Sequence, residues 1–445
     1  MGIAALILVL FVIVLPFTPM AGKIKRGLKE IFGSDAPPAE PPVLVTPAVV
    51  EPEPEPVEPD PGPPVPRGPI YLNVPKGTDV RKLAQKIDLK VDVHTETGGV
   101  ASQVRKANDS YLVEYTVKAK LPKPAKTMDE LLAVNPELEA MLPGLPAMLE
   151  KAAVSPWFEK LYMNKAARLR RDATQLGELL TRHNLYDCET MLNLRHPESG
   201  RRVFLMQAEM DVVSDGSDGD RLPVMPEKVV NSTYYQPFTT YGWRKTGTTP
   251  NPMIKGWEQR IENAKSELAK AETPAARKTW LRGRIKTLRE GVADMKNRSF
   301  LVAEYDPFIV IPVNILVDRK DSHAPNKGDY VIVIYGKKAY PAIVGDGGPD
   351  FKVGEGSLRF ARELNARAGI YSRPVSDLTV TYLVFPRSAD DAAVPDYGRW
   401  RKRCEALVKE IGGLGEGVEL HEWADLFPKL EEETVTPPAD SGNSE

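Results

Sequence analysis

The sequence predicts an α+β protein with a mostly β core, an inserted helical hairpin and an N-terminal β/helical extension. Three observations support this fold class. Short runs rich in Val, Ile and Tyr recur between residues 203 and 385. Two amphipathic stripes over residues 256–297 interrupt those runs and have helical spacing. Upstream of the core, three β-like runs precede a helical region at residues 127–187.

Both ends of the chain are predicted to lie outside the folded part. Residues 3–17 are almost wholly apolar and uncharged, so 1–21 are expected to form a membrane anchor or an uncleaved signal. Residues 22–69 combine a basic juxtamembrane segment with a Pro-rich linker, a composition that favours extended polyproline II. The acidic residues 430–445 are expected to be a disordered tail.

The N-terminal extension is predicted to cover residues 70–187. Its β-like runs lie at 70–74, 89–93 and 111–117. The helical region that follows carries one apolar stripe, which we expect to face the core. The opposite face is basic and is interpreted as solvated; its arginines are Arg168, Arg170, Arg171 and Arg182.

A second domain is predicted over residues 188–386, with the helical hairpin inserted in it. Strands are expected on both sides of the hairpin, at 203–210 before it and at 300–304 and 308–317 after it. Thr273 and Pro274 fit the cap and the first position of the second helix. A structural decoration is the preferred interpretation of the hairpin, and the wall of a binding groove is the alternative.

The C-terminal part is predicted to add one strand and one helix. The strand is expected at 377–385, and the helix at 400–411 within a C-terminal segment over 387–429. Cys188 and Cys404 are the only cysteines, too few for a disulfide framework or a Cys-based zinc site. They either form one pair or remain two buried free thiols.

The overall charge and the histidines exclude several classes of function. The chain has 59 Lys and Arg against 61 Asp and Glu, so its net charge of −2 gives no argument for nucleic acid as a partner. The five histidines lack metal-ligand spacing, and no Gly-x-Ser-x-Gly nucleophile motif accompanies them. Neither a zinc site nor a cofactor is therefore predicted.

A glycine-rich stretch at residues 343–357 carries two acids that we expect to be functional. A β run at 330–335 and a second at 339–344 surround a turn, so Asp346 is expected to follow directly on a strand end. Leu358 begins a helical spacing, which is expected to place Glu355 at the start of a helix. The stretch lacks the Lys-Ser/Thr of a phosphate loop.

A second acidic run lies at residues 209–221. Its aspartates do not fit the spacing of a calcium loop. Three alternatives stay open: a metal site, a polar loop that binds the hydroxyl and amino groups of a sugar, and turns closed by local hydrogen bonds. The residues expected to bind a sugar are Asp211, Asp215 and Asp218.

With histidine and phosphate chemistry poorly supported, a carboxylate pair remains as the candidate for catalysis. Hydrolysis of a glycosidic bond needs one protonated carboxyl, which gives its proton to the leaving oxygen, and one ionised carboxylate. Asp346 and Glu355 can supply these two groups if one rim of the domain holds both.

Three segments of the chain resemble the fungal-type chitosanases, glycoside hydrolase family 75. They contain Met-Asp-x-x-x-Asp-Gly within 208–220, Tyr-Asp-Pro-Phe-Ile-Val at 305–310, and Gly-Asp and Gly-Glu within 335–357. The resemblance covers about residues 188–385. It implies that Asp346 and Glu355 are the catalytic pair of an inverting hydrolase.

The resemblance has further implications for fold and substrate binding. By analogy it suggests that the β core is a six-stranded barrel of the double-psi kind. It also adds Tyr305 and Asp306 to the residues expected to bind substrate. The chain departs from the family in its N-terminal extension, its helical hairpin and its apolar N-terminal segment.

The function predicted from the sequence is an endo-acting, inverting hydrolase of chitosan or a related aminosugar polymer. The alternatives are a hydrolase of peptidoglycan or another surface glycan, and a non-catalytic carbohydrate-binding or envelope scaffold protein. The expected partners are the polysaccharide and, through the N-terminal segment, a membrane. No oligomeric state is predicted.

The predicted location contains a conflict. An enzyme that acts on an external polymer is expected outside the cytoplasm, either anchored to the membrane or secreted. Lys23, Lys25 and Arg26 follow the apolar segment and no Lys or Arg precedes it, which by the positive-inside bias puts the body of the protein in the cytoplasm.

Overall fold

The computed structural model describes residues 121–172, 187–370 and 374–428. The apolar N-terminal segment, the Pro-rich linker, the strands expected between residues 70 and 117, and the acidic tail lie outside the described residues. Within those three ranges, the structure has no helix whose length and apolar character would let it cross a membrane.

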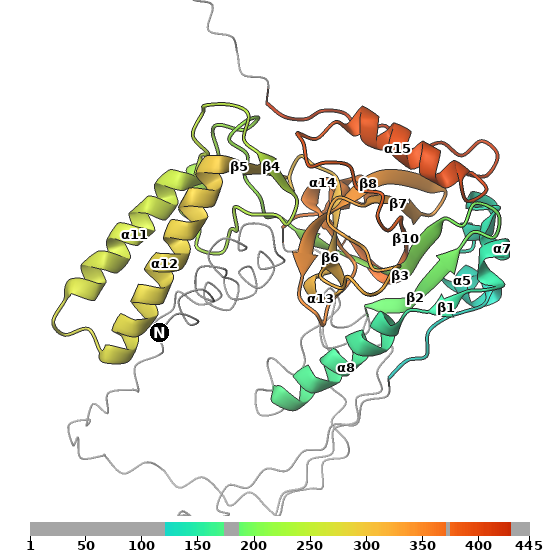
Figure 1. Cartoon of the computed structure of the whole chain (residues 1–445), viewed down its shortest axis with the longest axis horizontal. Helices are drawn as coiled ribbons and strands as arrows, with labels where there is room; N and C mark the ends of the chain where they lie inside the picture. Colours follow the sequence, from blue (N-terminus) through green and yellow to red (C-terminus); the bar gives the residue numbers. More distant parts are fainter. Residues whose placement is uncertain (1–120, 173–186, 371–373, 429–445) are drawn as a thin grey trace, which may run out of the picture.

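The core is a closed β-barrel of six strands, which confirms the predicted mostly β core (Figure 1). The barrel closes because the short strand β9 pairs with β6 on one side and with β3 on the other. The pairs β6–β8 and β3–β9 are parallel and the other pairs are antiparallel. In the order around the barrel, the strands are β3 (Arg202–Val213), β10 (Val375–Val384), β7 (Tyr330–Tyr335), β8 (Lys338–Gly348), β6 (Phe308–Pro312) and β9 (Glu355–Ser357).

Alternating side chains of the strands fill the inside of this barrel. Such residues come from β3, β6, β7, β8 and β10 and pack in one apolar cluster, as the period of two along each strand requires. At β9 the inward position is Gly356, where a Cβ would lie 3.1 Å from the sulfur of Met210. The cluster includes Met206, Met210, Ile309, Ile311, Val331, Val333, Ala342, Val344, Val380 and Tyr382.

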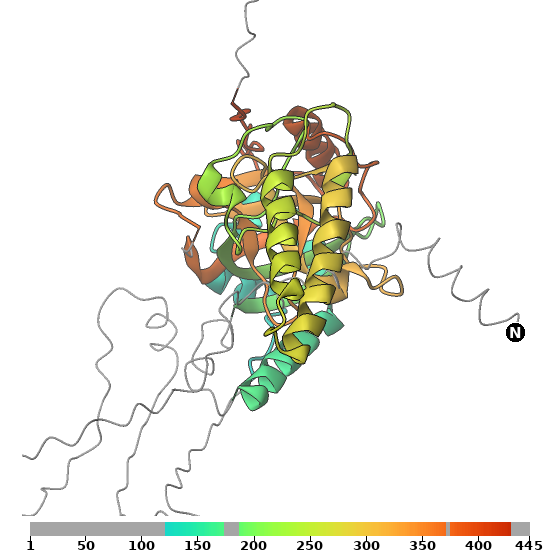
Figure 2. The same ribbon diagram turned by 90° about the vertical axis from the view of Figure 1, so that its left-hand side faces the viewer.

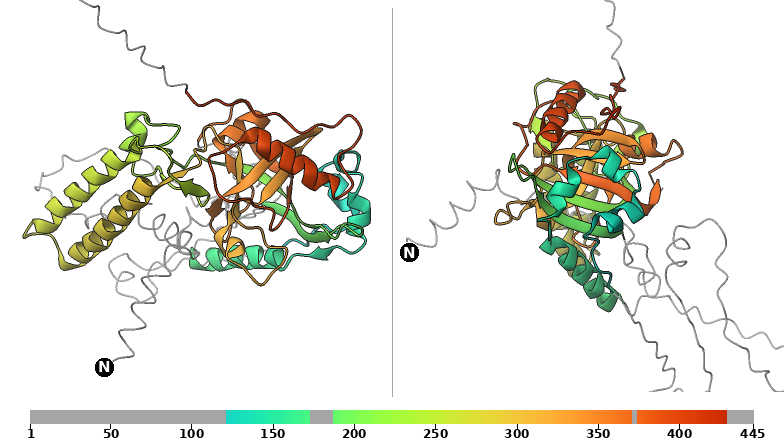
Figure 3. Two further views of the ribbon diagram at one scale, coloured as in Figure 1. Left: turned by 45° about the horizontal axis from the view of Figure 1, so that its top comes forward. Right: turned by 90° about the vertical axis from the view of Figure 1, so that its right-hand side faces the viewer.

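Two strands extend the sheet beyond the barrel. β2 (Cys188–Arg195) runs antiparallel to β3, and β1 (Ala153–Val154) pairs with β2. The helices α5 (Met128–Val134), α6 (Leu138–Met141) and α7 (Leu145–Leu149) bury their apolar faces beside β2, and α15 (Tyr397–Lys409) lies across β7 and β8 (Figure 3).

Local signals in the sequence fix where these helices begin. Thr127 and Glu130 form a capping box at the start of α5. Ser155 caps α8 (Pro156–Arg171), whose first residue is a proline, as helices favour at that position. Helix α15 begins after the cap Asp396, three residues before the predicted start.

The predicted helical hairpin is present and projects from the barrel (Figure 1), and its two helices lie side by side (Figure 2). It consists of α11 (Met253–Ala269) and α12 (Ala275–Asn297), packed on each other around their own apolar cluster. The antiparallel strands β4 (Gly242–Arg244) and β5 (Arg298–Phe300) join it to the barrel, and a short α10 (Glu227–Val230) precedes it. The structure therefore shows an insertion with a defined two-stranded base.

Two local predictions in this part are corrected. The cap of α12 is Pro274 and not Thr273, because the Thr273 hydroxyl donates instead to the carbonyl oxygen of Glu267. The run at 308–317 is not one strand. β6 ends at Pro312, whose extended backbone begins the one-turn helix α13 (Val313–Leu316).

The two cysteines are both free and buried, so the second of the two sequence-based alternatives holds. Cys188 begins β2, and its thiol donates to the carbonyl oxygen of Thr190. Cys404 lies on the inner side of α15, where its thiol donates to the carbonyl oxygen of Val331. Burial raises the pKa of both thiols, which keeps them protonated and poorly reactive.

Candidate carboxylate site

Asp346 lies inside β8 and not after it, which corrects the predicted strand end. The pairing of β8 with β6 shifts by one residue, since Val344 pairs with Ile309 and Asp346 pairs with Val310. Gly345 is the extra residue of this β-bulge. A Cβ at Gly345 would lie 2.6 Å from atoms of Phe308, so only glycine fits where the strand bends. The bulge turns Asp346 to the outer side of the barrel, beside Val310.

Glu355 also lies on a strand, so its predicted place at a helix start is wrong. It is the first residue of β9, where it pairs with Val310 of β6 and with Asp211 of β3. The helix α14 (Leu358–Leu364) begins three residues later, because the Ser357 hydroxyl caps it by accepting from the Phe360 amide. Two neighbouring strands bind the Glu355–Ser357 backbone and keep it extended.

The strand register places three acids in one row across the barrel wall. In order they are Asp346 on β8, Glu355 on β9 and Asp211 on β3, with Val310 of β6 between the first two. A Cβ at Gly348 would lie 3.0 Å from Oε2 of Glu355, so this glycine makes room for the carboxylate. Asp346 and Glu355 are two strands apart, which separates their backbones by roughly 9–10 Å.

The Asp346 carboxylate is fully buried and its Oδ1 accepts three hydrogen bonds. The donors are the Thr240 amide at 2.9 Å, the Thr240 hydroxyl at 3.1 Å and the Gly347 amide at 2.7 Å. The Tyr241 amide in turn donates to the Gly345 carbonyl oxygen at 2.7 Å. The chain segment before β4 therefore crosses the bulge and fixes the orientation of this carboxylate.

Lys352 joins the other two acids of the row. Its Nζ lies 2.6 Å from Oε1 of Glu355 and 2.7 Å from Oδ2 of Asp211. Burial alone would lower the pKa of Lys352, but the two carboxylates outweigh burial, so its pKa is raised. Lys352 is therefore a buried ammonium ion that bridges two carboxylates.

The loop that carries Lys352 is held in place by α8. Residues 349–354 connect β8 to β9, and Asn164 and Lys165 of α8 donate to the carbonyl oxygens of Asp350 and Phe351. The guanidinium of Arg168 stacks on the Phe351 ring at 4.2 Å. The predicted solvated face of α8 is therefore wrong for Arg168, which contacts this loop.

A buried ion pair completes the attachment of the loop. Lys165 Nζ lies 2.8 Å from Oδ2 of Asp187, and the same oxygen accepts from the Val353 amide at 3.2 Å. Both side chains of the pair are almost fully buried. The N-terminal extension thus reaches the candidate site through α8 and Asp187.

Two of the other predicted substrate-binding acids, Asp218 and Asp306, lie in a second cluster around Arg221. Both terminal nitrogens of Arg221 donate hydrogen bonds to Asp306 at 2.9 Å, and Nε of the same guanidinium donates to Asp218. The Tyr397 hydroxyl donates to Asp306 at 2.7 Å. Asp218 and Asp306 thus pair with the same cation of the chain.

Two further residues predicted to bind substrate lie away from the row as well. Tyr305 packs on the ring of Phe427 at 4.6 Å between ring centres. Asp215 is buried in the loop after β3, and its carbonyl oxygen accepts from the Ala303 amide. Of the predicted substrate-binding residues, the strand register therefore brings only Asp211 beside the proposed pair.

The site also contains residues that the sequence interpretation missed. Lys352 lies three residues before Glu355 within the glycine-rich stretch, so its proximity to the acid was a usable signal. Thr240 lies more than a hundred residues before Asp346, and no local pattern marks it. Glu209, fully buried on β3, alternates with Met210 and therefore shares the outer face with Asp211.

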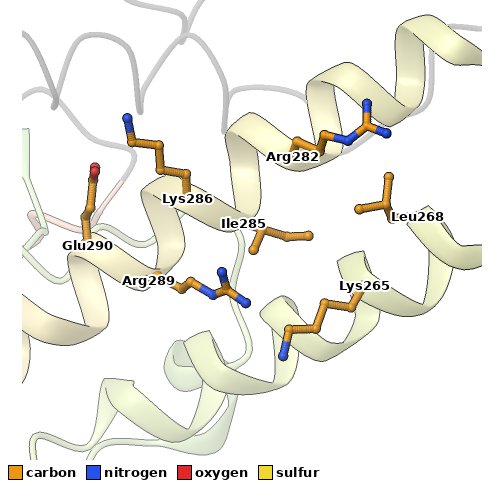
Figure 4. A pocket seen from close by; sticks show the side chains of 7 residues that line it. All are labelled: Lys265, Leu268, Arg282, Ile285, Lys286, Arg289 and Glu290. Atoms are coloured by element: carbon orange, nitrogen blue, oxygen red, sulfur yellow. The ribbon is translucent and has the colours of Figure 1, made fainter.

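The exposed surface at this row is small. Glu355 is 5% exposed, Asp211 is 1% exposed and Asp346 is not exposed. A cavity of about 580 Å³ lies instead on the helical hairpin, between α11 and α12 (Figure 4). Its lining residues are Lys265, Leu268, Arg282, Ile285, Lys286, Arg289 and Glu290, so it contains none of the candidate site residues.

Within the three described ranges, no group of three or more His, Cys, Asp and Glu side chains is arranged to hold a metal ion. No known family model matches the chain, and no curated protein matches it.

Proposed function

We propose that the chain is an endo-acting, inverting glycoside hydrolase that cleaves chitosan or a related cationic aminosugar polymer. Asp346 and Glu355 are the proposed acid and base pair. The observation that carries the proposal is the row in which both acids stand on the same wall of the barrel, on strands β8 and β9, with only Val310 between them.

The spacing of the two acids supports inversion over retention. Inverting enzymes place their carboxyl groups about 6.5–9.5 Å apart, because a water molecule must fit beside the anomeric carbon, whereas retaining enzymes place them at about 5–5.5 Å. Two strand spacings separate the backbones of Asp346 and Glu355 by roughly 9–10 Å, and both side chains extend from the same wall. This backbone spacing is compatible with the wider separation that inversion requires.

The local charge supports a cationic substrate. The outer face of β3, β9 and β8 carries Glu209, Asp211, Glu355 and Asp346, and Lys352 is the cation that bridges two of them. Carboxylates gathered on one wall attract the protonated amines of a glucosamine polymer.

The topology supports the resemblance to family 75 chitosanases. A double-psi barrel has six strands and contains parallel pairs between strands that are distant in sequence. The parallel pairs β3–β9 and β6–β8 meet this description, so the barrel is proposed to be of the double-psi kind. Its outer wall then carries the Gly-Asp and Gly-Glu segments on which the resemblance rests.

Substrate access to the pair requires a movement of the chain. Asp346 is not exposed and Glu355 is only 5% exposed, so a polymer reaches them only after a covering segment is displaced. The burial also favours a second candidate function, a carbohydrate-binding or envelope scaffold protein that has the same barrel but no turnover. For either function, the apolar N-terminal segment is proposed to anchor the protein at the outer side of a membrane.

Release of reducing ends from polysaccharides tests the proposal. The full-length protein is incubated with soluble chitosan and, separately, with peptidoglycan, and new reducing ends and bound polymer are measured. Reducing ends from chitosan that vanish in both Asp346→Asn and Glu355→Gln support the proposed hydrolase. Bound chitosan without new reducing ends supports the scaffold function, and cleavage of peptidoglycan alone shows another glycan hydrolase.

A further inference from the structure

We propose that Asp211 and Glu355 form an ammonium-binding site which Lys352 fills from within the chain, and that the protonated amine of a glucosamine unit binds there by replacing Lys352. This inference rests on the proposed function and specifies how the site selects its substrate. In this proposal the loop at 349–354 is a plug, because it closes the site until substrate binds. Lys352 then determines the specificity for a substrate that carries a protonated amine.

Lys352 already occupies the proposed site with its ammonium group. Its ammonium is within 2.7 Å of one oxygen from each carboxylate, and its side chain is only 10% exposed. A buried ammonium held by two carboxylates shows that this position accepts a primary amine cation. The contact also covers Glu355, so the plug accounts for part of the burial of the candidate pair.

Opening the site has an electrostatic cost. Moving Lys352 away would remove its ammonium from two buried carboxylates, which is unfavourable. A glucosamine ammonium that enters as Lys352 leaves replaces one cation with another. The exchange therefore avoids that cost for an amine, whereas a neutral N-acetylated unit cannot supply the missing charge.

The amine of glucosamine lies next to the bond that is cleaved. In glucosamine the amine is on C2, adjacent to the anomeric carbon at which the glycosidic bond breaks. A carboxylate whose Oε1 contacts that amine is within reach of the reacting atoms, and Oε2 of Glu355 lies over Gly348 on the side of Asp346. One glutamate can thus bind the amine and remain beside the scissile bond.

Helix α8 holds the loop that carries Lys352. Asn164 and Arg168 of α8 contact Asp350 and Phe351 of this loop. These contacts set how readily the loop withdraws Lys352. A protein whose binding-competent state is only partly populated binds its ligand more weakly by that fraction, so loosening the loop increases apparent affinity.

Calorimetric binding tests the exchange directly. The probes are a fully deacetylated glucosamine hexamer and the corresponding N-acetylated hexamer, and the full-length protein carries Asp346→Asn so that no turnover occurs. Adding Lys352→Met should tighten binding of the deacetylated hexamer by about tenfold or more and leave the N-acetylated hexamer unchanged. Adding Lys352→Arg, which keeps a competing cation, should give no gain.

Unchanged or weaker binding of the deacetylated hexamer in folded Lys352→Met would overturn the inference, because Lys352 would then be only a structural counter-ion. Equal gains for both hexamers would overturn it too, because the gain would not depend on the amine.

If Lys352→Met does not fold, the attachment of the loop supplies the second test. Asn164→Ala with Arg168→Ala should raise kcat/KM on chitosan several-fold, while Arg170→Ala, an exposed arginine on the same helix, should not change it. No gain in the double variant would contradict the plug.

The results also separate this inference from the proposed function. A wild-type protein that cleaves chitosan, with Lys352 variants that bind no differently, removes the inference alone. Tighter amine binding by Lys352→Met without any cleavage in the wild-type protein removes the hydrolase and keeps the ammonium site.

Discussion

Two clusters in this protein use the same components, one cation and two buried carboxylates, with different geometry. In one cluster Lys352 bridges Asp211 and Glu355 on the barrel wall. In the other Arg221 binds Asp218 and Asp306 at the base of the helical hairpin. Both contain residues that the sequence analysis expected to contact substrate.

The difference lies in how completely the partners are engaged. Arg221 donates from three nitrogens, and its guanidinium also stacks on the Phe427 ring at 4.0 Å. The Val302 amide and the Tyr397 hydroxyl donate to Asp306 as well. Burial and the neighbouring Asp306 raise the pKa of Tyr397, which therefore keeps its proton as a donor. This cluster joins the loop after β3, the segment after β5 and the start of α15.

The Lys352 cluster is the one in which we propose that the cation is exchanged. A lysine ammonium is a compact charge on a flexible stem, whereas a guanidinium in a bidentate pair has a fixed orientation. Only one oxygen of Glu355 contacts Lys352, and Asp346 stands two strands away on the same wall. A cation between two acids is therefore a structural contact in the Arg221 cluster and part of a candidate binding site in the Lys352 cluster.

The largest expected effect is a loss of kcat in variants of Asp346 and Glu355. Asp346→Asn and Glu355→Gln should each reduce kcat on chitosan by roughly a hundredfold or more, because each removes a group that moves a proton. Both changes keep the shape of the side chain, so the circular dichroism spectrum should remain that of the wild-type protein. Either variant with wild-type kcat would remove that residue from the catalytic pair.

The next effect is on stability and concerns Arg221. Arg221→Met should lower the free energy of unfolding by about 3–5 kcal/mol, because Asp218 and Asp306 would stay buried without their cation. Denaturant unfolding measures this loss. The kcat of the fraction that remains folded should equal that of the wild-type protein, and a selective loss of kcat would place this cluster in the catalytic machinery instead.

A smaller effect on stability is expected at Asp218, which the sequence analysis predicted to bind substrate. Asp218→Asn should lower the free energy of unfolding by about 1–3 kcal/mol and leave KM for chitosan unchanged. In a double-mutant cycle with Arg221→Met, the two changes should be strongly non-additive, since they break one interaction. A raised KM that shrinks at high salt would restore the substrate-binding role of Asp218.

The smallest effect is a pH dependence outside both clusters. Burial lowers the pKa of His323 and of His421 from the ordinary value of 6.5, and Asp321 and Glu363 oppose that shift only in part. The folded state thus favours neutral imidazoles, so stability is full above pH 6.5 and declines as pH falls below it. Thermal unfolding from pH 7.5 to 5 should show this decline, and His323→Gln with His421→Gln should reduce its slope.

The sequence predicted the hairpin, the last helix and most barrel strands because each has a regular apolar period over several residues. It failed at short elements whose structure is set by distant partners. Nothing local in Glu355-Gly-Ser357 marks a strand; β3 and β6 impose it. Likewise, the bulge that continues β8 through Asp346 depends on packing between Gly345 and Phe308.

The candidate site was predictable in part for the same reason. Asp346 and Glu355 were visible as acids in a glycine-rich stretch, and the register places them in one row. Asp218 and Asp306 looked similar from sequence, but their partner Arg221 reaches them only through folding. The pattern of charges in the sequence does not distinguish the carboxylates that pair with Arg221 from the carboxylates that lie beside the candidate reaction centre.

The configuration of the first product tests the central claim most directly, because it reports the spacing of Asp346 and Glu355 through the chemistry itself. The full-length protein is mixed with a chitosan oligomer, whose linkages are β, and proton NMR follows the anomers before they equilibrate. The account predicts that the α anomer appears first, as inversion by a widely spaced pair requires. Initial release of the β anomer, or no release of product at all, would contradict it.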